Sequence, residues 1–176
     1  TVEVNGQRYT GKNLVLATGS EPRTLGIEIG GRVMTSDQAL ALDEVPKRAV
    51  IIGGSVIGVE FASVWNSFGA GVTIIEALPS LVPLEAPVLS KCLERAFRKR
   101  KIAFKTGVKF TGVEQTENGA TVTLENGDTI ETDVVLVAVG RGPRSAGLGF
   151  EAAGVNVDRG WVPTDERLRT NVDGVF

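Results

Sequence analysis

The chain has 176 residues, of which 42% are hydrophobic, and this is enough to build one domain with a buried core. A formal net charge of −2 excludes the strongly basic surface that nucleic acids and anionic membranes attract, so we expect neither as a partner. One cysteine and no histidine exclude an internal disulfide, a thiolate or imidazole zinc site, and imidazole catalysis. Because no apolar run approaches the roughly 20 residues of a membrane span, we expect a cytoplasmic protein, and one without a metal site.

The first part of the chain predicts a hairpin, an apolar run and a short helix. Residues 1–10 contain two extended segments around an Asn-Gly dipeptide, which favours a two-residue hairpin turn. The apolar run Leu14–Ala17 is expected to be buried. Ser36 is expected to be the N-cap of a short helix that ends at Leu42, since a serine oxygen accepts a hydrogen bond from a free helical amide.

The centre of the chain, residues 48–76, has the layout of a βαβ nucleotide-binding unit. A continuous apolar run at Val50–Ile52 predicts a parallel strand that is buried on both faces. A glycine-rich turn follows, then a helical pattern that ends at Gly69, and then a second β-branched strand over 72–75. The predicted apolar face of the helix comprises positions i, i+4, i+7, i+8 and i+11, which are Ile57, Phe61, Val64, Trp65 and Phe68.

The glycine-rich turn departs at one position from the pattern G-x-G-x-x-G that is typical of dinucleotide sites. We expect Gly53 to make the tight turn and Gly58 to allow close packing of the helix on the strand. Ser55 replaces the middle glycine, where the backbone approaches a pyrophosphate most closely. Its Cβ and hydroxyl could clash with the phosphates or donate a hydrogen bond to them, and we expect weakened binding. In the alternative interpretation the turn binds no ligand.

Glu76 ends the second strand, 23 positions after Gly53. A carboxylate there can accept hydrogen bonds from both ribose hydroxyls of an adenosine and would repel a 2′-phosphate. No arginine follows it in Ala77, Leu78 or Pro79, so the sequence favours NAD over NADP. The alternative is a solvated carboxylate at a strand end.

The rest of the chain predicts one more helix, a meander and further strands. The helix covers Val88–Arg100 and has a basic last turn, which complements the helix dipole. Three alternating segments between 109 and 133 are separated by turns and predict an antiparallel β-meander. Buried strands are expected at Ile102–Thr106 and Val134–Val139, and a short helix near Gly149–Ala153.

These elements predict an α/β fold of three layers, Rossmann-like, in which helices cover one face of a parallel sheet. The three-stranded antiparallel meander covers the other face. The chain stops at Val175-Phe176, within an apolar segment, and we therefore expect it to be part of a larger protein. The single cysteine, Cys92, is expected to be an inert thiol.

One long segment, VIIGGSVIGVEFASVWNSFGAGVTIIEALPSLVP, resembles the dihydrolipoyl dehydrogenases, which belong to the flavin-dependent pyridine nucleotide-disulfide oxidoreductases. The flanking runs VLATGSEPR and VLVAVGRGPRS resemble the same family, and the tail TDERLRTNVDGVF resembles the approach to its second flavin-binding motif. The resemblance implies that residues 34–140 are an NAD-binding domain. Residues 1–33 and 141–176 would then be parts of the FAD-binding domain on either side of it.

The resemblance also implies roles for single residues. Glu76 would hold the adenosine ribose, the backbone of Phe110 would lie beside the adenine, and Gly140 would lie near the nicotinamide. Glu60 would orient the nicotinamide, although an acid there could equally just complement the start of the helix. The segment that would wrap the pyrophosphate and reach the nicotinamide comprises Gly53, Gly54, Ser55, Val56, Ile57, Gly58, Val59 and Glu60.

The catalytic parts of that family are missing from this sequence. It has neither the Cys-x4-Cys redox pair nor the C-terminal His-Glu couple, so we expect no catalytic residue here and no turnover by this chain alone. FAD and the lipoyl domains of 2-oxoacid dehydrogenase complexes would be partners of the parent protein, which reoxidises dihydrolipoamide with NAD. Two alternatives stay open. One is a non-binding structural or engineered fragment, and the other is a domain of another disulfide reductase, such as mercuric or glutathione reductase, which mostly use NADP.

Overall fold

The computed structural model describes all residues, 1–176, and the chain forms two compact units. One unit combines Thr1–Glu21 with Arg141–Phe176, and the other comprises Pro22–Gly140. No helix in the chain is both long enough and apolar enough to cross a lipid bilayer.

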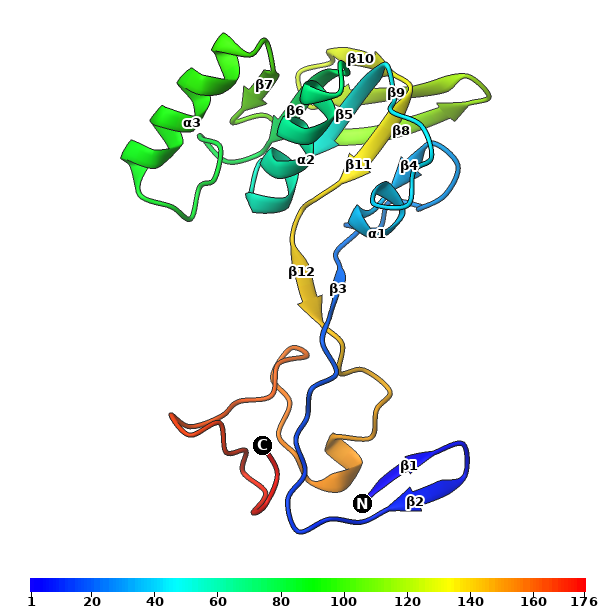
Figure 1. The fold of residues 1–176 in the computed structure, drawn as a ribbon, viewed down its shortest axis with the longest axis vertical. Coiled ribbons are helices and arrows are strands. Elements are labelled where there is room, and N and C mark those ends of the chain that lie inside the picture. The colour runs from blue at the N-terminus through cyan, green and yellow to red at the C-terminus, as the bar shows by residue number, and fades with distance from the viewer. The chain divides into compact units, whose positions relative to one another are not determined.

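A five-stranded parallel sheet forms the middle of the unit Pro22–Gly140 (Figure 1). Its strand order is β4-β11-β5-β6-β7, so the strand that comes last in the sequence lies between the first two. Val134–Val137 pair in register with residues 49–52, which in turn pair with residues 72–75. The strands are β4 (Val33–Met34), β5 (Arg48–Ile52), β6 (Gly71–Glu76), β7 (Ala103–Thr106) and β11 (Val134–Val137).

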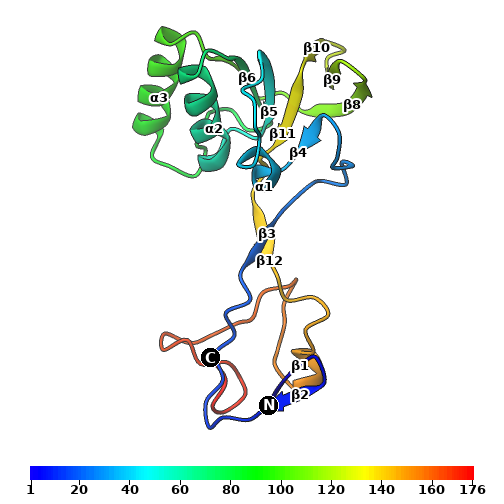
Figure 2. The same cartoon turned by 45° about the vertical axis from the view of Figure 1, so that its right-hand side comes forward.

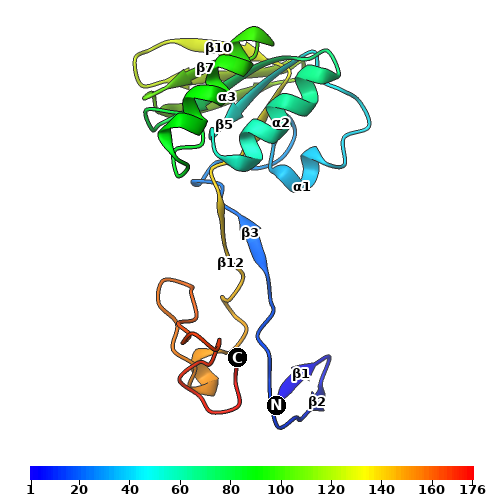
Figure 3. The same ribbon diagram turned by 60° about the vertical axis from the view of Figure 1, so that its left-hand side comes forward.

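Both faces of the sheet are covered, as the continuous apolar runs predicted. Figure 2 shows helices on one side of the sheet and the antiparallel meander on the other, and Figure 3 shows the helices lying across their face. This confirms the three-layer α/β fold. The helical layer consists of α1 (Ser36–Ala39), α2 (Val56–Ser67) and α3 (Pro87–Lys99), and the meander of β8 (Phe110–Thr116), β9 (Gly119–Leu124) and β10 (Thr129–Thr132).

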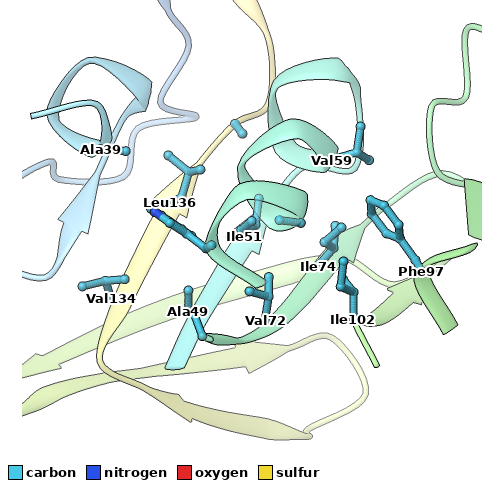
Figure 4. Packing of buried hydrophobic residues seen from close by; sticks show 14 of the residues in the cluster. Ala39, Ala49, Ile51, Val59, Val72, Ile74, Phe97, Ile102, Val134 and Leu136 are labelled. Atoms are coloured by element: carbon cyan, nitrogen blue, oxygen red, sulfur yellow. The ribbon is translucent and has the colours of Figure 1, made fainter. Parts of the chain in front are cut away.

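Side-chain alternation along the strands divides the core into two layers. Ala49 and Ile51 of β5 face the helices, where they pack with buried residues such as Phe97 of α3 (Figure 4). Val50 and Ile52 face the opposite way and pack with the meander, whose Val122 is fully buried. The strand is therefore buried on both sides, which explains why its sequence is a continuous apolar run rather than an alternating one.

The face through which helix α2 packs on the sheet overlaps only in part with the one its large apolar residues predicted, since Ile57 and Phe61 pack partly buried against the same core. Of the five predicted residues only Trp65 is buried, whereas Val64 and Phe68 are 47% and 68% exposed. Two of the four buried positions are small, Gly58 and Ala62, and small side chains let the helix backbone approach the strands closely. Gly69 ends the helix with φ of +98°, as predicted for a residue after the C-cap.

Other boundaries also differ from prediction. The N-cap of α1 is Thr35 rather than Ser36, because Thr35 forms a reciprocal capping box with Gln38. The helix ends at Ala39, three residues before the predicted end at Leu42.

The unit built from the two ends of the chain contains little regular structure. Strands β1 (Val2–Val4) and β2 (Gln7–Tyr9) form the predicted hairpin. The apolar run at 14–17 is not a buried strand, because Val15 is 70% exposed and the run forms one isolated bridge, from Leu14. The remaining elements are β3 (Ser20–Pro22), which pairs with β12 (Arg141–Pro143), and a 3₁₀ turn, η1 (Glu151–Ala153).

Candidate functional site

A cavity of about 540 Å³ lies at the carboxyl ends of the parallel strands. Ligands of open α/β sheets bind at this edge, and the volume lies within the usual range for small-molecule sites. All of the lining belongs to the unit Pro22–Gly140. The cavity brings together five of the residues that the sequence singled out, which are Gly53, Ser55, Glu76, Phe110 and Gly140.

The three glycines of the turn have no room for a side chain. A Cβ on Gly53 would overlap the carbonyl of Ala138, and the φ of Gly53 is +107°. A Cβ on Gly58 would overlap the carbonyl of Gly53, and one on Gly54 would lie 2.6 Å from a methyl of Leu81. Backbone atoms therefore exclude a Cβ at Gly53 and Gly58, whereas the obstacle at Gly54 is the fully buried side chain of Leu81.

Glu76 is buried and fixed by the backbone. Its Oε2 accepts the N–H of Gly54 over 2.7 Å, and its Oε1 accepts the N–H of Leu78 over 2.8 Å. The residue is 8% exposed, so it is not a solvated carboxylate at a strand end. Because each carboxylate oxygen has a second lone pair, both oxygens can still accept from a further donor in the cavity.

Ser55 is the N-cap of α2. Its φ of −84° is open to any residue, so the backbone does not require glycine here. Its hydroxyl makes no capping hydrogen bond, and the first helical amides, at Val56 and Ile57, have no carbonyl partner within the helix. The first turn also contains no acidic residue that would complement the positive end of the helix dipole.

The remaining predicted residues lie outside the cavity lining; Gly54 is buried in the turn, and the other five lie on α2. Gly58 and Val59 are buried beneath the turn, and Ile57 is half-buried. Val56 and Glu60 are exposed.

The sequence did not indicate the loop after β6 as part of the site. Leu81 is fully buried against Gly54, and the N–H of Val82 donates to the carbonyl of Gly54 over 2.8 Å. In the sequence, the loop could have been recognised as part of the site only from Leu81, an apolar residue within a proline-rich segment. The loop and the strand ends make most of the lining apolar, through Leu25, Ile52, Ile75, Ala77, Leu78, Pro83, Leu84, Val108, Ala138 and Val139, and Lys109 is its one cation.

The sequence matches the family described as "Pyridine nucleotide-disulphide oxidoreductase" over residues 1–176. The chain belongs to this family. Among curated relatives, the dihydrolipoyl dehydrogenase of Thermus scotoductus is 39% identical over 99% of this chain and 40% of its own length. A chloroplastic dihydrolipoyl dehydrogenase 2 of Arabidopsis thaliana is 42% identical over 94% of the chain and 31% of its own length. A leghemoglobin reductase of Vigna unguiculata is 38% identical over the whole chain and 35% of its own length.

Solved structures show the same fold. The HOCl-induced flavoprotein disulfide reductase RclA of Escherichia coli superposes with a TM-score of 0.88 at 31% identity, over 96% of this chain and 39% of that one. An NAD-dependent persulfide reductase of A. fulgidus gives 0.85 at 26% identity, over 98% and 34%. This chain therefore spans about two fifths or less of the length of each of these relatives.

Proposed function

We propose that the unit Pro22–Gly140 is an NAD-binding domain whose site is the glycine turn and the cavity beside it. The observation that carries the proposal is the buried carboxylate of Glu76, held by the amides of Gly54 and Leu78 at the edge of that cavity. A carboxylate so placed has acceptors left for the ribose hydroxyls of an adenosine. The family match and the glycines that exclude any Cβ support the same site.

The pyrophosphate would bind at the start of α2. The uncapped amides of Val56 and Ile57 offer hydrogen-bond donors, and the helix dipole favours negative charge there. Ser55 adds a Cβ and a hydroxyl to this turn, and the hydroxyl makes no capping hydrogen bond to the helix. We expect this side chain to weaken binding, because it occupies the point where the family's pattern has no side chain at all.

NAD is the expected cofactor rather than NADP. Glu76 would repel a 2′-phosphate, and the residues that follow it, Ala77 and Leu78, are apolar and line the cavity. Lys109 is the one cation of the lining and belongs to another segment, directly before β8. Its charge would reduce the discrimination against NADP but would not replace an arginine next to Glu76.

The parent protein would be a dihydrolipoyl dehydrogenase-like flavoenzyme. The curated relatives with that name, at 38–42% identity, support this assignment. Such an enzyme would use FAD and a redox disulfide to reoxidise dihydrolipoamide on lipoyl domains, and NAD would accept the hydride. With one cysteine and no histidine, we expect this chain to bind NAD without turnover. A cytoplasmic location stays a prediction, since relatives include mitochondrial and chloroplastic forms.

Calorimetric titration with NAD and NADP tests the proposal. We expect NAD to bind with a dissociation constant above the micromolar range, and NADP to bind more weakly. The absence of heat at millimolar NAD would contradict the proposal, and sub-micromolar affinity would contradict the expected effect of Ser55.

A second candidate is a structural fragment that binds no nucleotide, and Ser55 is the observation in its favour. The variant Ser55→Gly separates the two candidates. If binding appears only in this variant, the cavity is competent and the serine alone blocks it. If neither protein binds NAD, the structural fragment is supported.

A further inference from the structure

The backbone of Val82 fixes the orientation of one peptide in the glycine turn. Its N–H donates to the carbonyl of Gly54 over 2.8 Å. A peptide group is planar and trans, so its C=O and N–H point in opposite directions. The bond that holds the Gly54 carbonyl toward Val82 therefore directs the N–H of Ser55 away from Val82, and Ser55 lines the cavity.

Val82 adopts a backbone conformation that its own side chain disfavours. Its φ is +44°, in the left-handed region, where a β-branched residue is uncommon. Such a conformation persists only when surrounding contacts determine it. Leu81, directly before it, supplies one such contact, because its side chain is fully buried against Gly54.

Two side chains of α3 hold the same backbone segment. Ser90 Oγ donates to the carbonyl of Val82 over 3.3 Å, and Glu94 Oε1 accepts the N–H of Leu81 over 3.2 Å. The Glu94 side chain is 16% exposed, and its Oε2 lies 3.5 Å from a guanidinium nitrogen of Arg98. Neither Ser90 nor Glu94 lines the cavity. Helix α3 is thus connected to the turn without contributing to the binding surface.

We propose that Glu94 is a positioning residue for the nucleotide site. By holding residues 81–82, it orients the peptide whose N–H, at Ser55, faces the ligand. The inference rests on the proposed NAD binding, because the oriented N–H of Ser55 would donate a hydrogen bond to the pyrophosphate of that ligand. The effect of Glu94 should therefore be confined to ligands with a pyrophosphate, such as NAD and ADP-ribose, and should not extend to adenosine.

Titration of three variants with NAD, ADP-ribose and adenosine tests this role. Glu94→Ala removes the acceptor for the N–H of Leu81 and should weaken NAD and ADP-ribose about tenfold, with adenosine unchanged. Glu94→Gln keeps an acceptor oxygen and should bind like the wild type. Arg98→Ala removes the ion-pair partner of Glu94, together with the contact of that guanidinium with the Phe104 ring, and leaves the acceptor for Leu81 in place, so it serves as the control. Equal weakening of all three ligands, or a Gln variant as weak as the Ala variant, would overturn the proposal.

Amide hydrogen exchange of the nucleotide-free protein provides an independent readout. In Glu94→Ala the N–H of Val82 should exchange at least several-fold faster than in the wild type, because its segment is less restrained. The N–H groups of the central strand β11 should be unaffected, which also shows that the variant is folded. An exchange rate at Val82 that is the same in Glu94→Ala and in the wild type would contradict the positioning role but not the proposed NAD binding. A wild-type protein that does not bind NAD would instead defeat the proposed function.

Discussion

The N–H of Gly54 lies 2.7 Å from Oε2 of Glu76, and this hydrogen bond is buried. It connects the turn after β5 to the end of β6, two strands that lie side by side in the sheet. The other oxygen of Glu76 accepts the N–H of Leu78 over 2.8 Å. A single carboxylate therefore holds both loops at the mouth of the cavity while keeping lone pairs for a ligand.

Replacing Glu76 should cost stability as well as NAD binding. Glu76→Ala leaves the amides of Gly54 and Leu78 without their acceptor, and we expect the free energy of unfolding to fall by about 2–4 kcal/mol. Glu76→Gln should cost less, because the amide oxygen still accepts one of the two bonds. Urea denaturation measures both effects. An alanine variant as stable as the wild type would show that the two hydrogen bonds do not hold the loops.

Gly58 should tolerate no side chain. In Gly58→Ala the new methyl would overlap the carbonyl of Gly53, and we expect a loss of about 2–3 kcal/mol from overpacking. Gly112→Ala is the matched control, since a Cβ on Gly112 meets nothing within 4 Å. Thermal unfolding of the two variants compares them directly, and equal midpoints would contradict the close packing of α2 on β5.

Two substitutions of Ser55 separate the effect of its Cβ from that of its hydroxyl. Ser55→Gly removes both and should tighten NAD binding by about tenfold if the side chain crowds the phosphates. Ser55→Ala keeps the Cβ and should bind as weakly as the wild type. If Ser55→Ala binds more weakly than the wild type, the hydroxyl donates to the phosphates, and the crowding interpretation is wrong. Calorimetry provides the affinities.

Helix α3 begins without a side-chain cap. Its N-cap is Ala86, followed by Pro87, and no side chain accepts from the first helical amides. Ala86→Asp should stabilise the protein by about 1 kcal/mol, since a carboxylate there bonds a free amide and complements the helix dipole. Ala86→Asn retains the hydrogen bond without the charge, so it should retain most of the gain. No increase in the urea midpoint with either variant would contradict the uncapped start.

Asp133 should make stability depend on pH. Burial raises the pKa of Asp133, but hydrogen bonds from the backbone and guanidinium of Arg48, with its charge, outweigh burial and lower the pKa below the usual 3.8. A carboxyl with a lowered folded pKa stabilises above its unfolded pKa and loses that contribution as pH falls through the folded value. Asp133→Asn should therefore cost about 1 kcal/mol at neutral pH, with the difference shrinking below about pH 4. A difference that stays constant from pH 7 to pH 3 would contradict this.

The sequence predicted the fold well where local pattern and tertiary packing agree. Val50–Ile52 and Val134–Val139 are apolar without interruption because both faces of the sheet are covered, and this pattern identifies a central parallel strand from sequence alone. The meander was equally clear from its Asn-Gly turn and alternating residues.

The prediction was only partly right where packing depends on small residues. Helix α2 shows a large apolar stripe whose Val64 and Phe68 are exposed, whereas Gly58 and Ala62, outside that stripe, are buried and let the backbone approach the sheet. A hydrophobicity pattern gives glycine and alanine little weight. It therefore indicates that a helix exists but gives the face that it buries only approximately.

The sequence indicated several residues that line the cavity, but not the hydrogen bonds that hold the glycine turn in place. The glycines, Ser55 and Glu76 follow from motif spacing in the chain. The hydrogen bonds from Val82 to Gly54 and from Leu81 to Glu94 join segments that are far apart in sequence. No local sequence pattern encodes such pairs, so they can be identified only from the three-dimensional structure.

The central claim is that NAD binds at the glycine turn, and NMR titration of the labelled protein with NAD tests it most directly. We predict that amide shifts change first at Ser55, Val56 and Ile57, and at Leu78 next to Glu76, while the amides of β8–β10 beyond Phe110 stay unchanged. Titration to millimolar NAD without shifts at these amides, or with shifts confined to another part of the chain, would contradict the claim.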